Sequence, residues 1–459
     1  MKLNQLIQDL DLIRVTGDTD REVSSVVFDS RSVTGGSLFV AVRGTEADGH
    51  RFIPAAVKAG AVAVVCEEIP EETEEGVTYI LTGNSRRAIA LIASAWHGHP
   101  SREINLVGVT GTNGKTTIAT LLYKVHTSLG YKAGILTTIE VIIHDRSYPA
   151  THTTPDPLQI NKWLREMVDQ GCSYCFMEVS SHAASQHRID RLHFRGGVFT
   201  NLTHDHLDYH KDFREYLEAK RSFFNQLDEK AFALTNADDR NGEVMLQNCR
   251  AAKQRYSLGK FADYHGRVLE SYFEGMRLQI NDTEVWVRLT GRFNASNILA
   301  VYGASLLLGH DEPEVLEAIS KAGAAEGRFE VLKGSGGTIA IIDYAHTDDA
   351  LKNVLETIQE VNTGDRQVIT VVGAGGDRDR TKRAAMGAVA AELSNRVILT
   401  SDNPRSENPA AIMAEMEEGI PAERAGDILK ITDREEAIKT ACMLAGPAAV
   451  ILVAGKGHE

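Results

Sequence analysis

Short apolar runs rich in β-branched residues alternate along the chain with segments of helical periodicity. We expect buried strands at 104–110, 174–179, 197–202, 339–344, 368–372, 396–400 and 448–454. The segment after Lys115 predicts a helix, because its apolar residues recur on one helical face at Ile118, Leu121, Leu122, Val125 and Leu129. Strands that alternate with helices form parallel sheets whose faces the helices cover. The pattern therefore predicts an α/β fold.

The alternation falls into three blocks, which predict three domains. Residues 1–100 form a small N-terminal α/β domain, ending in the linker-like sequence HGHP at 97–100. Residues 101–329 form a central domain whose parallel sheet is of the P-loop ATPase type, because the sequence TGTNGKTT at 110–117 follows a predicted strand and opens a predicted helix. Residues 330–459 follow the Gly- and Ala-rich stretch 322–327 and form a C-terminal Rossmann-like, doubly wound domain. A chain of 459 residues is long enough for several separate cores.

Charge and cysteine content narrow the functional classes. The chain has 63 acidic and 49 basic residues, a formal net charge of −14, which argues against a general binder of nucleic acid or of membrane surfaces. Its apolar runs are too short to span a bilayer, and its N-terminus lacks the pattern of a signal peptide. Five cysteines are an odd number for a disulfide framework, and Cys172 and Cys175 read as buried strand residues rather than a redox or zinc pair. We expect a cytoplasmic monomer.

The strongest local motif is TGTNGKTT at 110–117, between a predicted strand and a predicted helix. Glycines let such a loop curl its N–H groups around phosphate oxygens, while Lys115 neutralises phosphate charge and Thr116 offers a hydroxyl to Mg²⁺. Val109 stands where a strict P-loop has its first glycine, so a glycine-rich turn with an incidental lysine is the alternative. The candidate nucleotide-binding residues are Thr110, Gly111, Thr112, Asn113, Gly114, Lys115, Thr116 and Thr117.

Acidic and imidazole side chains follow two of the predicted strands. Glu178 lies at the carboxyl end of a strand, where open α/β sheets bind ligands, although it could equally pair with an N–H at a helix start. The stretch 201–210 carries three His and two Asp, and with no Cys close by it favours Mg²⁺ over zinc. The alternative is a polar loop that caps a helix beginning near Asp212. Lys220, taken alone, reads as a solvated helix residue.

Together these motifs resemble the Mur ligase family. The resemblance covers nearly the whole chain, and its motifs occur in the family's order at 28–31, 110–117, 177–182, 205–208, 294–297, 343–347, 402–405 and 455–459. It implies three domains that bind a UDP moiety, ATP and an incoming amino acid in turn. The implied activity is ATP-dependent, ADP-forming amide synthesis for peptidoglycan, which joins meso-diaminopimelate to UDP-N-acetylmuramoyl-L-alanyl-D-glutamate through an acyl phosphate.

The resemblance also implies residue roles. The implied catalytic residues are Lys115, Glu178, His206 and Lys220. The implied ligands of Mg²⁺ are Thr116, Glu178, His206 and Lys220, the last in carbamylated form. The implied further nucleotide contacts are Asn294, Arg328 and Asp343. The implied uridine pocket is Phe28, Ser30, Thr45, Glu46 and Ala47. The implied muramoyl-peptide contacts are Thr153, Thr154, Ser180, Gln186 and Arg188. Alternatively, Ser30 and Thr153 are turn residues and Arg188 is part of a surface ion pair.

The amino-acid specificity rests on a four-residue motif, Asp402, Asn403, Pro404 and Arg405. An arginine fork can grip a carboxylate with two hydrogen bonds, and diaminopimelate carries a distal carboxylate that lysine lacks. In the family this motif accompanies diaminopimelate, with further implied contacts at Arg378, Gly455 and Glu459. The alternative is an ordinary turn with an exposed arginine.

The sequence departs from the family's pattern at two places, and two alternative functions remain open. Asp348-Asp349 replaces the family's common Pro-Asp, and the matching pattern would continue past Glu459, so we expect a shortened last domain. A ligase adding lysine or a D-alanyl dipeptide, or one that polyglutamylates folate, is the nearest alternative. A regulatory P-loop NTPase is the alternative from another class, and it leaves the motif at 402–405 unexplained.

Overall fold

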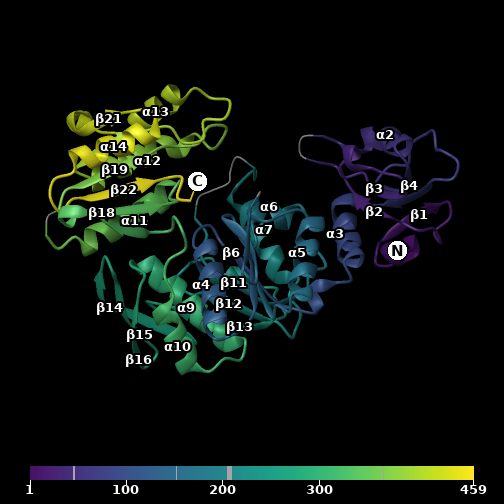
Figure 1. Ribbon diagram of the computed structural model, residues 1–459, viewed down its shortest axis with the longest axis horizontal. Helices are drawn as coiled ribbons and strands as arrows, with labels where there is room; N and C mark the ends of the chain where they lie inside the picture. Colours follow the sequence, from purple (N-terminus) through teal and green to yellow (C-terminus); the bar gives the residue numbers. More distant parts are fainter. Residues whose placement is uncertain (45–46, 151, 204–208, 365, 459) are drawn as a thin grey trace. The chain divides into compact units, whose positions relative to one another are not determined.

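The computed structural model describes residues 1–44, 47–150, 152–203, 209–364 and 366–458 (Figure 1). Their strands belong to three sheets of five, eleven and six strands. The chain divides into two compact units, one of residues 1–108 and 131–195, the other of residues 109–130 and 196–459. Short 3₁₀ turns lie at Ser30–Ser32, Gly49–Phe52, Pro100–Arg102, Ser335–Gly337 and Ala422–Asp427.

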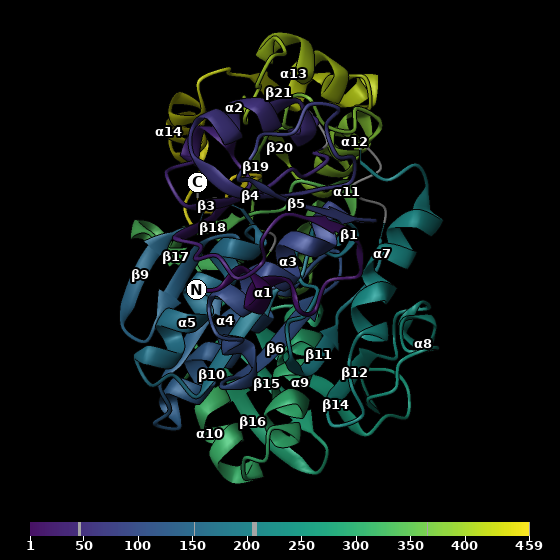
Figure 2. The same ribbon diagram turned by 90° about the vertical axis from the view of Figure 1, so that its right-hand side faces the viewer.

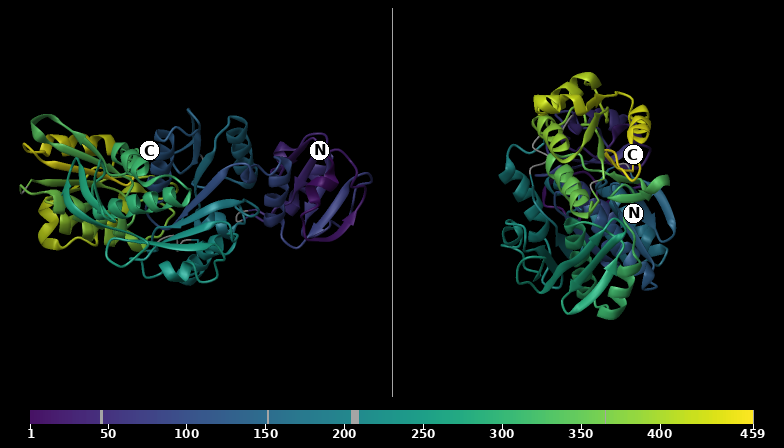
Figure 3. Two further views of the ribbon diagram at one scale, coloured as in Figure 1. Left: turned by 90° about the horizontal axis from the view of Figure 1, so that it is seen from below. Right: turned by 90° about the vertical axis from the view of Figure 1, so that its left-hand side faces the viewer.

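The first unit begins with the five-stranded sheet, which is drawn in purple in Figure 3. Its elements are α1 (Leu3–Ile7), β1 (Leu12–Thr16), β2 (Ser25–Val27), β3 (Ser37–Val40), α2 (Ile53–Lys58), β4 (Ala61–Cys66), β5 (Thr78–Thr82) and α3 (Ser85–Trp96). The strand order is β1-β5-β4-β3-β2, and only β1 runs antiparallel to its neighbour. Alternate strand residues face α1 and α3 on one side and α2 on the other, as two hydrophobic clusters show.

The remainder of the first unit supplies strands of the central sheet. Its elements are β7 (Ala133–Leu136), β8 (Glu140–Ile143), β9 (Arg146–Pro149), α5 (Pro157–Asp169), β10 (Tyr174–Glu178) and α6 (Ser181–Ser185). β10 runs parallel to β7, and β7, β8 and β9 form an antiparallel meander. The thiols of Cys172 and Cys175 are buried, as predicted, and burial raises the pKa of both. Cys175 lies in β10, whereas Cys172 precedes this strand, so only Cys175 is a strand residue.

The second unit opens where β6 (Asn105–Thr110) leads into α4 (Lys115–Ser128). The elements that follow are β11 (Phe194–Phe199), α7 (Phe213–Asn225), β12 (Phe232–Asn236), α8 (Gly242–Met245), β13 (Ala252–Ser257), β14 (Tyr264–Tyr272), β15 (Gly275–Ile280), β16 (Thr283–Val287), α9 (Arg292–Leu307) and α10 (Glu312–Lys321). β11 to β14 pair in parallel, and β14 to β16 are antiparallel. Four of the five residues predicted to form the apolar face of α4 are buried, and α4 packs on α9 and α10.

The second unit ends in the six-stranded sheet. Its elements are β17 (Glu330–Lys333), β18 (Ile339–Asp343), α11 (Asp348–Val361), β19 (Val368–Val372), α12 (Thr381–Leu393), β20 (Arg396–Leu399), α13 (Pro409–Glu417), β21 (Ile428–Lys430), α14 (Arg434–Leu444) and β22 (Val450–Ala454). The order is β17-β18-β22-β19-β20-β21, parallel except for β17. Helices α11, α12 and α13 cover one face and α14 the other (Figure 2). This is the doubly wound arrangement that the sequence predicts.

The three-domain α/β fold is therefore confirmed, whereas the boundaries at 100 and 329 stay predictions. One strand prediction was displaced: β11 spans Phe194–Phe199 rather than 197–202. Its first half carries the exposed Arg195 and a glycine, which weaken the apolar pattern, and the residues after Phe199 form a loop that bonds to the phosphate-binding motif. No helix within the described residues has the length and apolar character needed to cross a bilayer.

Candidate active site

The loop at 110–117 joins β6 to α4, as predicted, and two of its residues must be glycine. Gly111 has φ +150° and Gly114 has φ +86°, conformations that side chains disfavour. A Cβ on Gly111 would lie 1.8 Å from Oγ1 of Thr200, and one on Gly114 would lie 2.5 Å from Oδ1 of Asn297. The backbone thus curls tightly at the N-terminus of a helix, where N–H groups are suited to bind phosphate.

The same loop is fixed by the segment that follows β11. The N–H of Thr112 donates to the carbonyl of Asn201 (2.8 Å), and the N–H of Asn113 donates to Oδ1 of Asn201 (2.9 Å). Oγ1 of Thr200 donates to the carbonyl of Asn113 (2.6 Å). On its other side, Nδ2 of Asn113 donates to Oδ2 of Asp349 at the start of α11 (3.3 Å). The loop is therefore held in one conformation by neighbours from two other segments.

Two lysine ammonium groups converge on one carbonyl of the loop. Nζ of Lys115 donates to the carbonyls of Gly111 (2.9 Å) and Thr112 (2.7 Å). Nζ of Lys220, on α7, donates to the same Gly111 carbonyl (2.7 Å) and lies 4.7 Å from the ring centroid of Tyr216. The side chain of Lys220 is 1% exposed, so its interpretation as a solvated helix residue is wrong. Its burial arises because α7 turns the face that carries Tyr216 and Lys220 inward.

Glu178 is the last residue of β10, and its side chain is buried. Several hydroxyl groups lie near it, and that of Thr138 bonds to its carboxylate. Its Oε1 accepts the N–H of Thr138 (2.8 Å), and its Oε2 accepts the hydroxyl of Thr138 (3.3 Å). That hydroxyl also lies 3.1 Å from Oγ1 of Thr153. The hydroxyl of Thr154 donates to the main-chain carbonyl of Glu178 (2.9 Å) and accepts the N–H of Ser180 (3.1 Å).

Arg188 bonds to the main chain of this cluster. Nη1 of Arg188 donates to the carbonyl of Thr154 (2.7 Å), while its Nε and Nη2 donate to Oε1 of Gln186 (3.0 and 2.6 Å). These bonds hold the Arg188 guanidinium against Gln186 and against the main chain at Thr154. The structure brings together the five residues predicted to contact the muramoyl peptide, and it places them beside Glu178.

One of the predicted nucleotide contacts, Arg328, forms a hydrogen bond with the phosphate-binding loop. Nη2 of Arg328 donates to Oγ1 of Thr116 (3.1 Å), and its guanidinium lies 4.3 Å from the ring centroid of Tyr344. Asp343, at the end of β18, accepts the N–H groups of Phe329 and Ala345, each at 2.7 Å. Burial raises the pKa of Asp343, while Arg328 opposes that shift.

Asn294 belongs to the interior of α9. Its Nδ2 donates to the carbonyl of Thr290 (2.8 Å), and its Oδ1 accepts Nδ2 of Asn297 (3.2 Å). Asn297 is the residue that approaches Gly114. Asn294 thus supports the neighbour of the phosphate-binding loop.

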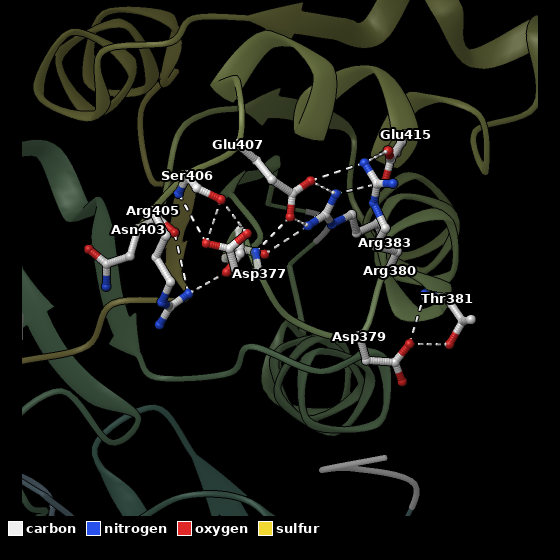
Figure 4. A network of polar contacts seen from close by, with 12 residues as sticks. Asp377, Asp379, Arg380, Thr381, Arg383, Asn403, Arg405, Ser406, Glu407 and Glu415 are labelled. Carbon is white, nitrogen blue, oxygen red and sulfur yellow. Dashed lines mark hydrogen bonds and ion pairs between the residues drawn. The ribbon is translucent and has the colours of Figure 1, made fainter. Parts of the chain in front are cut away.

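The loops that follow β19 and β20 meet around the motif at 402–405 (Figure 4). The loop that follows β22 also bonds to this motif. Nη1 of Arg405 donates to the carbonyl of Gly376 (2.6 Å), and the N–H of Gly376 donates to the carbonyl of Asn403 (2.9 Å). A Cβ on Gly376 would lie 1.9 Å from the carbonyl oxygen of Pro404. Nζ of Lys456 donates to Oδ1 of Asn403 (3.0 Å).

Asp402, the first residue of the motif at 402–405, lies beside the loop that follows β22. Its Oδ1 accepts the N–H of Asn403 (2.6 Å), and its Oδ2 lies 3.4 Å from Nη2 of Arg434. Gly455 has φ +111°, and a Cβ there would lie 2.7 Å from Oδ2 of Asp402. The motif is therefore no isolated turn.

The predicted uridine residues lie in the first unit. Ser30 opens a 3₁₀ turn that Asp29 caps by accepting the N–H of Arg31. Hydrogen bonds from the guanidinium and from the backbone N–H of Arg31 lower the pKa of Asp29. Phe28 and Ala47 are exposed. Thr45, Glu46, His206 and Glu459 lie outside the described residues.

Comparison with known proteins decides the family. The chain matches the patterns of three domains: Mur ligase family, catalytic domain, over 22–97; Mur ligase middle domain over 109–305; and Mur ligase, glutamate ligase domain, over 327–457. A protein of Bacteroides thetaiotaomicron is 53% identical over 100% of this chain and 95% of its own length.

This chain belongs to the Mur ligase family.

Two relatives of this ligase carry the same name. The Bacteroides protein is named UDP-N-acetylmuramoyl-L-alanyl-D-glutamate--2,6-diaminopimelate ligase, and so is a Clostridioides difficile protein that is 38% identical over 100% of the chain and 95% of its own length. A solved structure of a ligase of that name is 30% identical, with a TM-score of 0.71 over 100% of this chain and 94% of the other. A MurF ligase of Thermotoga maritima, solved in complex with ADP, shares the fold (20% identity, TM-score 0.65, 94% of each chain).

Three residues of these clusters were not identified from the sequence: Thr138, Thr200 and Tyr216. For Tyr216 a signal exists, because it lies four residues before Lys220 and so on the same helical face. Thr138 follows β7, which gives it a place at a strand end like that of Glu178.

Proposed function

We propose that this ligase uses ATP to add meso-diaminopimelate to UDP-N-acetylmuramoyl-L-alanyl-D-glutamate in peptidoglycan precursor synthesis. The anchored fork of Arg405 carries the choice of amino acid. One of its nitrogens is fixed on the carbonyl of Gly376, and Nε and Nη2 make no further hydrogen bond within the described residues. Two parallel donors suit a carboxylate, and the far end of diaminopimelate has one. The names of relatives that match the whole chain support the same choice.

The reaction proceeds in two displacements. The side-chain carboxylate of the D-glutamyl residue attacks the γ-phosphorus of ATP, the bond to the β-phosphate oxygen breaks, and ADP leaves. The amine of diaminopimelate then attacks the acyl carbon and loses a proton, the C–O bond breaks, and inorganic phosphate leaves. Both first reactants are anions, so the N–H groups of the 111–114 turn and Nζ of Lys115 act by offsetting their repulsion.

The residues present fit a phosphate-bound divalent cation. The turn at Gly111 and Gly114 is too tight for side chains, as close backbone approach to phosphate requires, and a hydroxyl (Thr116) follows it. Mg²⁺, when bound, neutralises phosphate charge and polarises the phosphoryl group. Its proposed protein ligands are Thr116, Glu178, His206 and Lys220 in carbamylated form.

The surroundings of Lys220 support a carbamate. Carbamylation requires a neutral amine, whose nitrogen bonds to the carbon of CO₂ and releases a proton. Burial and a nearby positive charge both favour the neutral form of a lysine. Lys220 is 1% exposed, and its Nζ shares the Gly111 carbonyl with Nζ of Lys115, so the two nitrogens lie within about 6 Å of each other. The carbamate would turn this amine into an anion able to hold a cation.

We propose the other substrate contacts at the predicted site residues in the two units. Thr153, Thr154, Ser180, Gln186 and Arg188 bind the muramoyl dipeptide. Asn294, Arg328 and Asp343 serve the nucleotide. Phe28, Ser30 and the 45–47 stretch bind uridine, and Arg378, Gly455 and Glu459 assist Arg405. We place the reaction in the cytoplasm and expect a monomer.

The direct test is ADP release by the purified protein. We expect release only when ATP, the UDP-linked dipeptide and meso-diaminopimelate are all present. Steady release with ATP alone would contradict the ligase reaction and favour a regulatory NTPase. Release supported by L-lysine or a D-alanyl dipeptide, and not by diaminopimelate, would assign a different amino acid.

A further inference from the structure

A buried arginine lies behind the loops that present Arg405. Arg383, on α12, has a side chain only 1% exposed, although it is charged. Its Nη1 and Nη2 donate in parallel to Oε2 and Oε1 of Glu407 (2.9 and 2.8 Å), and Nη1 also donates to Oε2 of Glu415 (2.7 Å). Figure 4 shows the guanidinium between the two carboxylates. Such a fork fixes geometry, whereas its net contribution to stability is reduced by the cost of desolvating the charges.

The fork is connected to both loops of the amino-acid site. Nη2 of Arg383 donates to the carbonyl of Gly375 (3.1 Å), and Oε1 of Glu407 accepts the N–H of Asp377 (2.6 Å). The Asp377 carboxylate in turn accepts the N–H (3.0 Å) and the hydroxyl (2.7 Å) of Ser406. Arg405 and its anchor Gly376 lie between these bonds in sequence. The two residues flanking Gly376, and the one after Arg405, are therefore all held by a network centred on Arg383 and Glu407.

The backbone of these loops needs such support. Asp377 has φ +52° and Arg405 has φ +49°, both in the left-handed region that residues other than glycine rarely occupy. Such a conformation is strained and persists only where its surroundings fix it. The cross-loop bonds of Glu407 and Asp377 supply that constraint.

We propose that Arg383 is a positioning residue for the diamino acid: through Glu407 it holds the loops so that the free edge of Arg405 faces the distal carboxylate. This inference rests on the proposed function. Arg383 itself touches no substrate. Its loss therefore affects the binding of one substrate, because the phosphate-binding loop and the muramoyl-peptide cluster do not depend on it.

The test is a kinetic comparison of Arg383→Lys with the parent enzyme. Lysine keeps the charge but lacks the fork, so we expect the KM for meso-diaminopimelate to rise by about tenfold or more. The KM values for ATP and for the UDP-linked dipeptide should change less than twofold. Glu407→Gln, which keeps the size of the side chain, should give the same pattern and serves if Arg383→Lys does not fold. An unchanged KM for diaminopimelate in a folded variant, or an equal rise for every substrate, would overturn the proposal.

Arg380 provides a matched control. It pairs with Glu407 and Glu415 as well, but from the surface, with its side chain 63% exposed. Exposed pairs contribute little, so Arg380→Ala should change the KM for diaminopimelate less than twofold. An effect as large as that of Arg383→Lys would show that the KM responds to any change in the pairing of Glu407, which would contradict a specific positioning role for the Arg383 fork.

A double mutant separates this inference from the proposed function. In an Arg405→Ala background, Arg383→Lys should cause no further rise in the KM for diaminopimelate, because the group it positions is gone. Additive effects would overturn the positioning role alone. If the parent does not use diaminopimelate, or Arg405→Ala leaves its KM unchanged, the proposed amino-acid specificity fails instead.

Discussion

Replacing Arg405 by alanine removes the proposed carboxylate fork with little change to the backbone. The residue has φ +49°, and alanine is about as disfavoured there as arginine, so the substitution reports on the side chain. The substitution removes the bonds from Nη1 to the carbonyls of Gly376 (2.6 Å) and Asn403 (3.5 Å). It also removes the two donors, Nε and Nη2, that remain for a ligand. The main-chain bond from Gly376 to Asn403 stays. We therefore expect a folded enzyme with a weakened site for one substrate.

The size of the effect follows from those two donors. A hydrogen bond to a charged group contributes about 1.5–3 kcal/mol, with the lower end appropriate for a residue as exposed as Arg405. At that lower end two such bonds total about 3 kcal/mol, which corresponds to a roughly hundredfold rise in the KM for diaminopimelate, within a range of about ten- to thousandfold, since about 1.4 kcal/mol is a factor of ten. Arg405→Lys keeps the charge without the fork and should lie between the parent and Arg405→Ala.

The assay is initial-rate kinetics with diaminopimelate varied at saturating ATP and UDP-linked dipeptide, repeated with ATP varied. The KM for ATP should stay within twofold of the parent value. Lys430→Ala, which removes a surface lysine paired with Glu417, is the control for loss of a positive charge. L-lysine need not become a good substrate, because removing one group creates no new contact and Arg378 remains. Unchanged diaminopimelate kinetics in Arg405→Ala would show that Arg405 only packs on a surface turn.

Three further predictions concern the lysines and the buried fork. Lys115→Ala should abolish ADP formation while thermal unfolding stays nearly unchanged, because Nζ bonds to loop carbonyls instead of packing in a core; normal turnover or an unfolded protein would contradict this. Lys220→Ala should lose activity that formate or acetate partly restores, and ¹³C-bicarbonate should give a carbamate NMR signal in the parent that this variant lacks; a bare ammonium in a substrate-bound crystal would count against it. Hydrogen bonds from Arg383 lower the pKa of Glu407 from 4.5 to about 2. The stabilising contribution of the pair is thus complete above pH 4.5 and is lost as the pH falls towards 2, so the difference in unfolding free energy between the parent and Glu407→Gln should shrink below pH 4.5 in urea titrations; a pH-independent difference would refute the pairing.

The hydrophobic pattern predicted the buried strands well where both faces are covered. The strand at 368–372 has the predicted bounds, because all five residues of β19 are buried apolar or small side chains. β11 was displaced because Arg195 and Gly196 interrupt the pattern at its start. A strand end that carries charge or glycine is stabilised by its neighbours in the sheet, which a single sequence does not display.

The candidate site was predictable where motifs are local. The loop at 110–117 and Glu178 occupy the expected strand ends, since the spacing of strand, loop and helix is contained in adjacent residues. The burial of Lys220 and of Arg383 was not predictable from polarity. Each depends on partners far along the chain, the Gly111 carbonyl in one case and two glutamates of α13 and its preceding loop in the other. Buried charges arise from such long-range pairing, whereas periodicity counts any lysine or arginine as solvated.

The central claim, diaminopimelate as the amino acid, is tested most directly by competition. The enzyme is given ATP, the UDP-linked dipeptide and equal concentrations of meso-diaminopimelate and L-lysine, and the UDP-linked tripeptide is identified by mass spectrometry. We predict that the product contains diaminopimelate almost exclusively, because only that amino acid offers Arg405 a distal carboxylate. A product that contains mainly lysine, or equal amounts of both tripeptides, would contradict the account.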